Sequence, residues 1–166
     1  MGISKNKGLH GGTTVLKNSA QEPEISDLCN CLSTMGAKIE NSGKGEIVIE
    51  GVESLSGSTH QVLLDRIELG TYMLAPAIAG GSLFLKKGAR WLLTNFCNKL
   101  EEIGISIEEK NEGLLVVGAK GAKRATSIVT APYPGFPTDL QAQMMALLTL
   151  ANGESVLEET IFENRF

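Results

Sequence analysis

The strongest constraint on this 166-residue chain is that one order of secondary-structure signals occurs twice, with a period of about 70 residues. In each copy a pair of glycines precedes a short predicted strand, at residues 13–16 and at residues 82–85. Each strand leads to an amphipathic helix whose apolar residues step by three and four positions. The second apolar set is the first shifted by 68 positions, so that Cys97 matches Cys29 and Gly104 matches Gly36. The two sets are Ile25, Leu28, Cys29, Leu32 and Met35, and then Leu93, Phe96, Cys97, Leu100 and Ile103.

Two predicted strands follow each of these helices, at residues 37–40 and 46–50 and again at residues 105–108 and 114–117. Two further helices are predicted to begin at Asp65 and at Asp139, and a strand at residues 155–159 begins a third copy. The recurring order of helices and strands predicts an α/β (α+β) fold assembled from repeated units.

Each unit carries an apolar helix face that only a neighbouring unit can cover. We therefore expect these faces to lie open to water in this chain, which favours association or a loosely packed state. Ser19 and Glu22 have the spacing of a capping box, so the first helix is expected to begin there, with Pro23 in its first turn. Pro76 lies late in its helix and is expected to kink or fray that end.

Composition narrows the class of protein. The chain is 42% hydrophobic and 20% charged, which is ordinary for a globular protein. Its net charge is −4 and no cluster of Lys and Arg exceeds a pair, which argues against nucleic-acid binding. No apolar run is long enough to span a membrane, and residues 1–12 lack the apolar centre of a secretory signal. We expect a cytoplasmic protein with neither a membrane nor a nucleic-acid partner.

The cysteines and histidines do not predict a metal site. Cys29 and Cys31 are two positions apart and point in different directions on a helix, so they cannot hold one ion. We expect these two and Cys97 to be buried, reduced thiols. His10 and His60 have no ligand-type partner at suitable spacing and receive no role.

The most informative stretch for chemistry is residues 131–166. Pro132, Pro134 and Pro137 favour a stiff, extended segment that leads to Asp139 and to a helix expected over residues 140–151. A carboxylate at a helix start stays ionised and can accept a proton from a substrate hydroxyl, so Asp139 is the leading candidate for a general base. The alternative is that Asp139, with Thr138 before it, is a helix N-cap, and the two roles are compatible.

Two arginines are weaker candidates. The guanidinium of Arg165 matches phosphate and carboxylate groups, although an arginine near a chain end is usually solvated surface. Arg66 follows Asp65 at the junction of the two halves, where a helix cap and a surface charge are the simpler interpretation.

Particular segments add a resemblance to a known family. NSAQEPEISDL, MGAKI, IVIEGVESLSG, LLDRIELGTY, APYPGFPTDLQAQ and ETIFENRF closely resemble the UDP-N-acetylglucosamine enolpyruvyl transferases, also called UDP-N-acetylglucosamine 1-carboxyvinyltransferases. The resemblance covers nearly all of residues 12–166. It implies the enolpyruvyl transferase fold, in which each of two lobes is an inside-out α/β barrel of three similar units. Residues 1–63 would be the last unit of one lobe, and residues 64–166 an incomplete part of the other.

The resemblance also implies an activity, which is transfer of the enolpyruvyl group of phosphoenolpyruvate to the 3-hydroxyl of UDP-N-acetylglucosamine in peptidoglycan synthesis. Asp139 matches the aspartate that takes the hydroxyl proton, and Ile161 matches the apolar residue that touches the UDP-sugar. Arg165 matches the arginine beside the phosphate-bearing substrate, and Arg66 matches a site-lining arginine. Thr138 and Phe162, their neighbours in the motifs, complete the expected substrate-binding set. The resemblance implies no metal and no organic cofactor.

Other parts of the family pattern have no counterpart in residues 1–166. They are the early Lys-Asn pair, the loop with the catalytic cysteine, the uridine-binding loop and the arginines of the C-terminal third. We therefore expect the middle portion of such an enzyme, inactive alone and dependent on the missing parts as partners. Two alternatives remain, a non-catalytic remnant or binding module of the same fold, and an enolpyruvyl transferase of the shikimate pathway.

Overall fold

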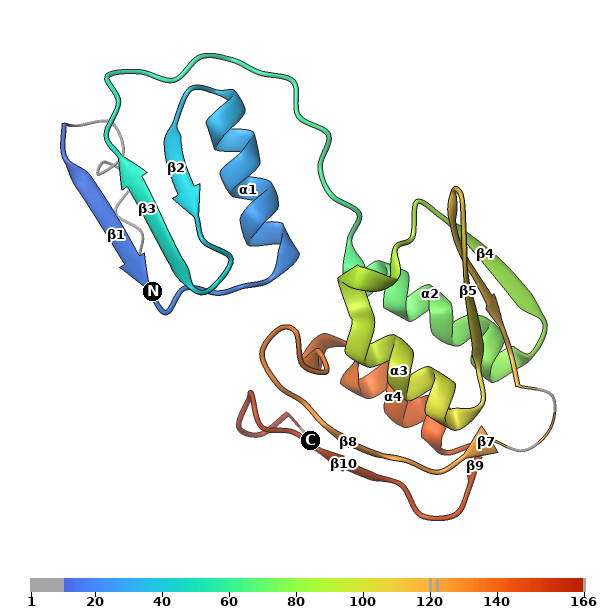
Figure 1. The fold of residues 1–166 in the computed structure, drawn as a ribbon. Coiled ribbons are helices and arrows are strands. Elements are labelled where there is room, and N and C mark those ends of the chain that lie inside the picture. Colours follow the sequence, from blue (N-terminus) through green and yellow to red (C-terminus); the bar gives the residue numbers. More distant parts are fainter. Residues whose placement is uncertain (1–10, 120, 122, 166) are drawn as a thin grey trace. The chain divides into compact units, whose positions relative to one another are not determined.

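The computed structural model describes residues 11–119, 121 and 123–165, in two compact units, Met1–Leu63 and Leu64–Phe166. Figure 1 labels the helices and strands of each unit. His10 and most of residues 1–12, where a secretory signal would lie, are outside the described residues. Among the helices of the described part, none is both long and apolar enough to cross a membrane.

The first unit is a three-stranded antiparallel sheet with one helix. Its elements are β1 (Thr13–Lys17), α1 (Pro23–Thr34), β2 (Lys38–Asn41) and β3 (Glu46–Glu50). The strand order is β1-β3-β2, with Val48 of β3 opposite Val15 on one side and Glu40 on the other. Residues 51–63 then pass α1 without regular structure, and Asp27 holds them there. Its carboxylate lies 3.1 Å from His60 Nε2 and accepts a hydrogen bond from the Leu63 N–H at 3.3 Å.

The expected capping box of α1 is wrong. The helix begins at Pro23, its N-cap is Glu22, and no side chain caps it. The reason is local, because a residue before proline is driven out of the helical region, and Glu22 is extended with ψ 143°. Ser19 consequently lies outside the helix, with its N–H bonded to the carbonyl of Gly45.

The second unit repeats the sheet of the first. Strands β4 (Ser82–Lys86), β5 (Ser106–Lys110) and β6 (Gly113–Val117) form an antiparallel sheet in the order β4-β6-β5. Strand order and pairing match β1-β3-β2, so the predicted repeat is confirmed. The remaining elements are α2 (Arg66–Ala79), η1 (Arg90–Leu93), α3 (Thr94–Ile103), β7 (Lys123–Arg124), β8 (Ser127–Val129), η2 (Thr138–Leu140), α4 (Gln141–Leu148), β9 (Ala151–Asn152) and β10 (Val156–Glu158).

Helix α2 begins as the sequence predicts and α4 ends earlier than predicted. Asp65 caps α2 by accepting hydrogen bonds from the N–H groups of Ile67 and Glu68, and the helix continues through Pro76 to Ala79. The helix expected over residues 140–151 is shorter, because residues 151–152 form β9 and pair in parallel with β7.

The core of the second unit lies among its three helices. Helix α2 lies against α4 on one side and against β4 and β6 of the β4-β6-β5 sheet, and Figure 1 shows α3 in the same part of the unit. Gly70 of α2 leaves the space that the side chain of Leu140 occupies, which brings α2 against η2. The expected open apolar face is therefore wrong for α3, whose matching residues are all buried. They are Leu93, Phe96, Cys97, Leu100 and Ile103.

The architecture agrees with an incomplete repeat fold. The described residues mix helices and strands, and their sheets have two or three strands each. They form no closed barrel.

Candidate functional site

The candidate site lies at the carboxyl ends of two parallel strands, β8 and β10. Val129 of β8 is in register with Glu158 of β10, so both strands end side by side. Beyond β8 the chain runs through residues 131–137 to Thr138 and Asp139. Beyond β10 it turns back through Thr160 to Arg165. The two motif segments, residues 131–143 and 159–166, therefore both start at one edge of the same pair of strands.

The proline-rich segment before Asp139 is fixed at several points. Phe136 is buried, with its ring centroid 5.6 Å from that of Phe96 on α3. The side chain of Asn95 donates to the carbonyl of Pro134 at 2.6 Å, and the hydroxyl of Tyr133 donates to the carbonyl of Trp91 at 3.3 Å. These contacts hold the segment against α3 and η1, as expected of a stiff lead-in.

Asp139 does not cap a helix. It lies inside η2, whose N-cap is Pro137, and neither η2 nor α4 has a side-chain cap. The 3₁₀ turn delays the start of α4 to Gln141 and makes Leu140 its N-cap, so Asp139 lies one residue before that capping position. Its carboxylate instead accepts a hydrogen bond from Arg165 Nη2 at 3.1 Å, and 58% of the side chain remains exposed. The N-cap interpretation is wrong, and the carboxylate is open to a ligand.

Arg165 is exposed, as expected of a surface arginine, but its guanidinium is also bonded to neighbouring side chains. Besides Asp139, its guanidinium donates from Nη1 to Thr138 Oγ1 at 3.0 Å. The same group lies 5.4 Å from the centre of the Phe162 ring, within the range of a cation–π interaction. One arginine from the last turn thus joins both polar residues of the Pro137-Thr138-Asp139 motif.

Glu159 stands at the centre of this arrangement and was not singled out from the sequence. Its carboxylate accepts hydrogen bonds from the hydroxyls of Thr138 at 2.7 Å and Thr130 at 3.0 Å. It also accepts from the N–H groups of Ile161 at 2.8 Å and Phe162 at 3.2 Å. Burial raises the pKa of Glu159, but the four hydrogen bonds outweigh it, so the pKa is lower than usual and the group is an anion. The available sequence signal was spacing: Glu159 lies two residues before Ile161 and three before Phe162, close enough for its carboxylate to accept their N–H groups.

The structure brings together five of the six predicted site residues, which are Thr138, Asp139, Ile161, Phe162 and Arg165. Arg66, the sixth, contacts the lead-in segment, where its guanidinium lies 5.8 Å from the centre of the Tyr133 ring. We call the five residues together with Glu159 and Thr130 the Asp139 cluster.

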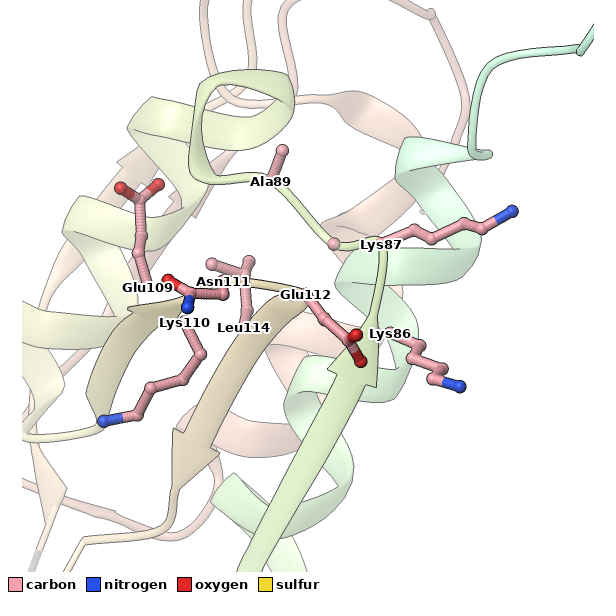
Figure 2. Close-up of a pocket in the computed structure, with 10 residues that line it drawn as sticks. Lys86, Lys87, Ala89, Glu109, Lys110, Asn111, Glu112 and Leu114 are labelled. Atoms are coloured by element: carbon pink, nitrogen blue, oxygen red, sulfur yellow. The ribbon is translucent and has the colours of Figure 1, made fainter.

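A hollow on the second unit lies elsewhere. It has a volume of about 620 Å³ and lies at the end of β4 and the turn between β5 and β6, sharing no residue with the Asp139 cluster. Figure 2 shows Lys86 and Lys87 extending on one side of it, and Glu109 and Lys110 on the other. Because these charges are of both signs and do not converge, the hollow is a poor candidate for an anion site.

Comparison with known proteins shows the family to which the chain belongs. The profile of the family described as EPSP synthase (3-phosphoshikimate 1-carboxyvinyltransferase) matches residues 7–166, and the chain belongs to this family. Among solved structures, the enolpyruvyl transferase NikO from Streptomyces tendae matches with a TM-score of 0.82 and 24% identity, over 96% of this chain and 38% of that one. This likeness confirms the enolpyruvyl transferase fold.

Curated relatives then narrow the resemblance. A UDP-N-acetylglucosamine 1-carboxyvinyltransferase from Paracoccus denitrificans (strain Pd 1222) is 59% identical over 158 residues, which are 95% of this chain and 37% of the relative. A protein of the same name from Cereibacter sphaeroides (strain ATCC 17029 / ATH 2.4.9) is 61% identical over the same shares. The resemblance drawn from the sequence segments is confirmed, and the chain spans about 37% of the length of these relatives.

Proposed function

We propose that this chain forms part of a UDP-N-acetylglucosamine 1-carboxyvinyltransferase. Such an enzyme transfers the enolpyruvyl group of phosphoenolpyruvate to the 3-hydroxyl of UDP-N-acetylglucosamine, in the cytoplasm, for peptidoglycan synthesis and thus for cell shape and division. The observation that carries the proposal is the open carboxylate of Asp139, held 3.1 Å from Arg165 by residues of two separate motifs. Relatives of this name at 59% and 61% identity support it.

Asp139 is the general base of the proposed reaction. A sugar hydroxyl is a poor nucleophile at neutral pH, so its proton must leave as its oxygen bonds to C2 of the enolpyruvyl group. The Asp139 carboxylate takes that proton, and the bond between C2 and the phosphate oxygen breaks with release of phosphate. An exposed fraction of 58% leaves the carboxylate room to meet the hydroxyl.

Arg165 binds the anionic donor. In the free protein its guanidinium is shared between Asp139 and Thr138. A guanidinium has five N–H donors, and those that Thr138 and Asp139 leave unused can bind a phosphate or carboxylate. Phosphoenolpyruvate thus binds to Arg165 while the side chain stays beside Asp139, and Ile161 and Phe162 offer apolar surface to the UDP-sugar.

The test uses a complete enzyme in which this chain replaces the matching 158-residue segment of the Paracoccus denitrificans relative. Release of phosphate is measured with phosphoenolpyruvate and UDP-N-acetylglucosamine. We expect the hybrid to turn over and the variant Asp139→Asn to be slower by about 10²–10⁴-fold, the usual contribution of a general base. Glu154→Gln, an exposed acid of the same unit, is the control and should change turnover by less than about 2-fold.

Two outcomes would overturn the proposal. Turnover with 3-phosphoshikimate in place of the UDP-sugar would assign the chain to the shikimate-type reaction. A folded hybrid without any turnover would identify the chain as a non-catalytic module of the same fold.

A further inference from the structure

We propose that Glu159 is a positioning residue that holds Arg165 beside Asp139, acting through the hydroxyl of Thr138. This inference rests on the proposed function for its catalytic consequence, but the arrangement itself can be tested without the reaction. Glu159 touches neither Asp139 nor Arg165 through any contact found among the described residues, so its action is indirect.

The anchoring of Glu159 makes it a fixed point. It follows β10 directly, as Thr130 follows β8, and the two strands are paired in parallel. Thr130 is fully buried, and its N–H, carbonyl and hydroxyl all make hydrogen bonds. Its hydroxyl donates to Glu159 at 3.0 Å and accepts from the N–H of Thr160 at 2.9 Å. The hydrogen bond from Thr130 thus fixes Glu159 against the strand pair, independently of its hydrogen bond from Thr138.

The direction of each hydrogen bond follows from the chemistry of the groups. A guanidinium only donates, an ionised carboxylate only accepts, and a hydroxyl has one proton to donate. Thr138 must therefore donate to Glu159 at 2.7 Å and accept from Arg165 Nη1 at 3.0 Å. The remaining fork of Arg165, Nη2, then points to Asp139 at 3.1 Å. The charge of Glu159 fixes the orientation of this whole series.

An amide at position 159 would disturb that orientation. The carboxylate accepts four hydrogen bonds through two oxygens, whereas glutamine has one oxygen and an NH₂ group that only donates. With Glu159→Gln, either the N–H groups of Ile161 and Phe162 or the hydroxyl of Thr138 would face a donor. Thr138 would no longer present its lone pairs reliably to Arg165.

The first experiment uses the 166-residue chain and nuclear magnetic resonance. In Glu159→Gln we expect the Arg165 guanidinium signals to become those of a mobile side chain. The Ile161 and Phe162 amides should exchange with solvent at least about 10-fold faster. Glu158→Gln is the matched control, since Glu158 is an exposed acid on β10 and should leave both readouts unchanged. Unchanged Arg165 signals in Glu159→Gln, or equal changes in both variants, would overturn the proposal.

A second variant guards against misfolding of the first. Thr138→Val removes the link between Glu159 and Arg165, while the other three hydrogen bonds of Glu159 remain possible. We expect it to mobilise Arg165 with the Ile161 and Phe162 amides still protected. An Arg165 that stayed ordered in Thr138→Val would contradict the indirect route.

The catalytic consequence is measured in the hybrid enzyme described above. Glu159→Gln should lower kcat by about 10–100-fold, because small displacements of reacting groups are that costly. KM for the UDP-sugar should change by less than about 3-fold, since the loss falls mainly on the transition state. An inactive native hybrid would refute the proposed function alone and leave the resonance result standing. A mobile Arg165 with an unchanged kcat would refute the positioning role alone.

Discussion

Helices α1 and α3 occupy matching places in the two copies of the repeat, but the apolar face of α3 is buried and that of α1 is not. In α3 the five matching residues are all buried, with Phe96, Cys97 and Leu100 each 0% exposed. In α1 none of the corresponding residues is buried, and Leu28, which matches Phe96, is 52% exposed. Among the described residues of the first unit, Ile47 is the one large apolar side chain that is buried.

The difference shows that an amphipathic pattern specifies a face but not what covers it. The sheets behind α1 and α3 have the same strand order, so they cannot be the cause. The second unit has two more helices, α2 and α4, and its core residues Met73, Met144 and Leu147 come from them. The first unit has α1 alone against its sheet. A segment of this size buries too small a share of its surface to be very stable.

The largest expected effect comes from truncating the matching residues Phe96 and Leu28. Phe96→Ala should lower the free energy of unfolding of the second unit by about 3–5 kcal/mol, because it leaves a cavity in a packed core. Leu28→Ala should cost about 0.5 kcal/mol or less, as for an exposed position. Residues 1–63 contain no aromatic residue and Trp91 is the single tryptophan, so its fluorescence in urea reports on the second unit. Hydrogen exchange of β1 and β3 reports on the first. Equal costs would mean that something covers α1.

The matching cysteines give the second contrast. Burial raises the pKa of the Cys97 thiol to about 11, and Cys97 is 0% exposed. Burial also raises the pKa of Cys29, against a hydrogen bond from Asn41, but this thiol is only half-buried. At pH 8 we expect iodoacetamide to modify Cys29 about 100-fold or more faster than Cys97, which must wait for local opening. Peptide mass spectrometry measures both rates, and in urea the difference should disappear. Similar rates in the folded chain would show that the core around α3 opens as readily as that around α1.

The same contrast explains how far the sequence could predict the fold. The repeat was visible because apolar residues and glycines recur at a fixed spacing, and the matching strand orders confirm it. The prediction of an exposed apolar face is wrong for α3, because the pattern alone does not show that α2, α4 and Phe136 contribute to the same core. The prediction that all three thiols are buried is confirmed for Cys97 and wrong for Cys29 and Cys31, which are half-buried.

In the candidate site, the sequence indicated the residues but not their connections. The motifs indicated Asp139 and Arg165 as site residues, and in the structure the two side chains are hydrogen-bonded to each other. The cap expected at Asp139 failed because a 3₁₀ turn precedes α4. Glu159 was missed because its role depends on the pairing of β8 with β10, and β8 is three residues long with no clear signal of its own.

Helix starts give the third contrast. Asp65 accepts two N–H groups of α2, at 2.8 Å and 3.1 Å, so Asp65→Ala should destabilise the second unit by about 1 kcal/mol. Asp65→Asn preserves the cap and should cost only a few tenths of that. Glu22 caps nothing in α1, and its Oε2 is buried without a hydrogen-bond partner among the described residues. Glu22→Ala should therefore change the stability of the first unit by less than about 0.5 kcal/mol. Urea titration followed by Trp91 fluorescence and by hydrogen exchange separates the two, and a larger loss in Glu22→Ala would reverse the comparison.

The smallest expected effect concerns ion pairs. Arg90 donates to both oxygens of Glu101 at 2.7 Å and 2.6 Å, which lowers the pKa of Glu101 despite its partial burial. In the first unit, Lys38 and Glu50 are 3.6 Å apart, and their side chains are 67% and 60% exposed. At pH 7, Glu101→Gln should cost about 0.5–1 kcal/mol, a value limited by solvent screening, and Glu50→Gln should cost nothing measurable.

Acid should abolish the advantage of Glu101. Its folded pKa lies below the unfolded value of about 4.3, so its contribution is complete above that value and is lost as the pH falls through the folded pKa. Melting curves of the native chain and of Glu101→Gln, followed by Trp91 fluorescence, should differ at pH 7 and converge on acidification. Because glutamine does not titrate, the difference isolates Glu101 from the other carboxylates of the unit. A gap between the two curves that persisted at the lowest pH where the chain stays folded would show that Glu101 acts by packing and not by its charge.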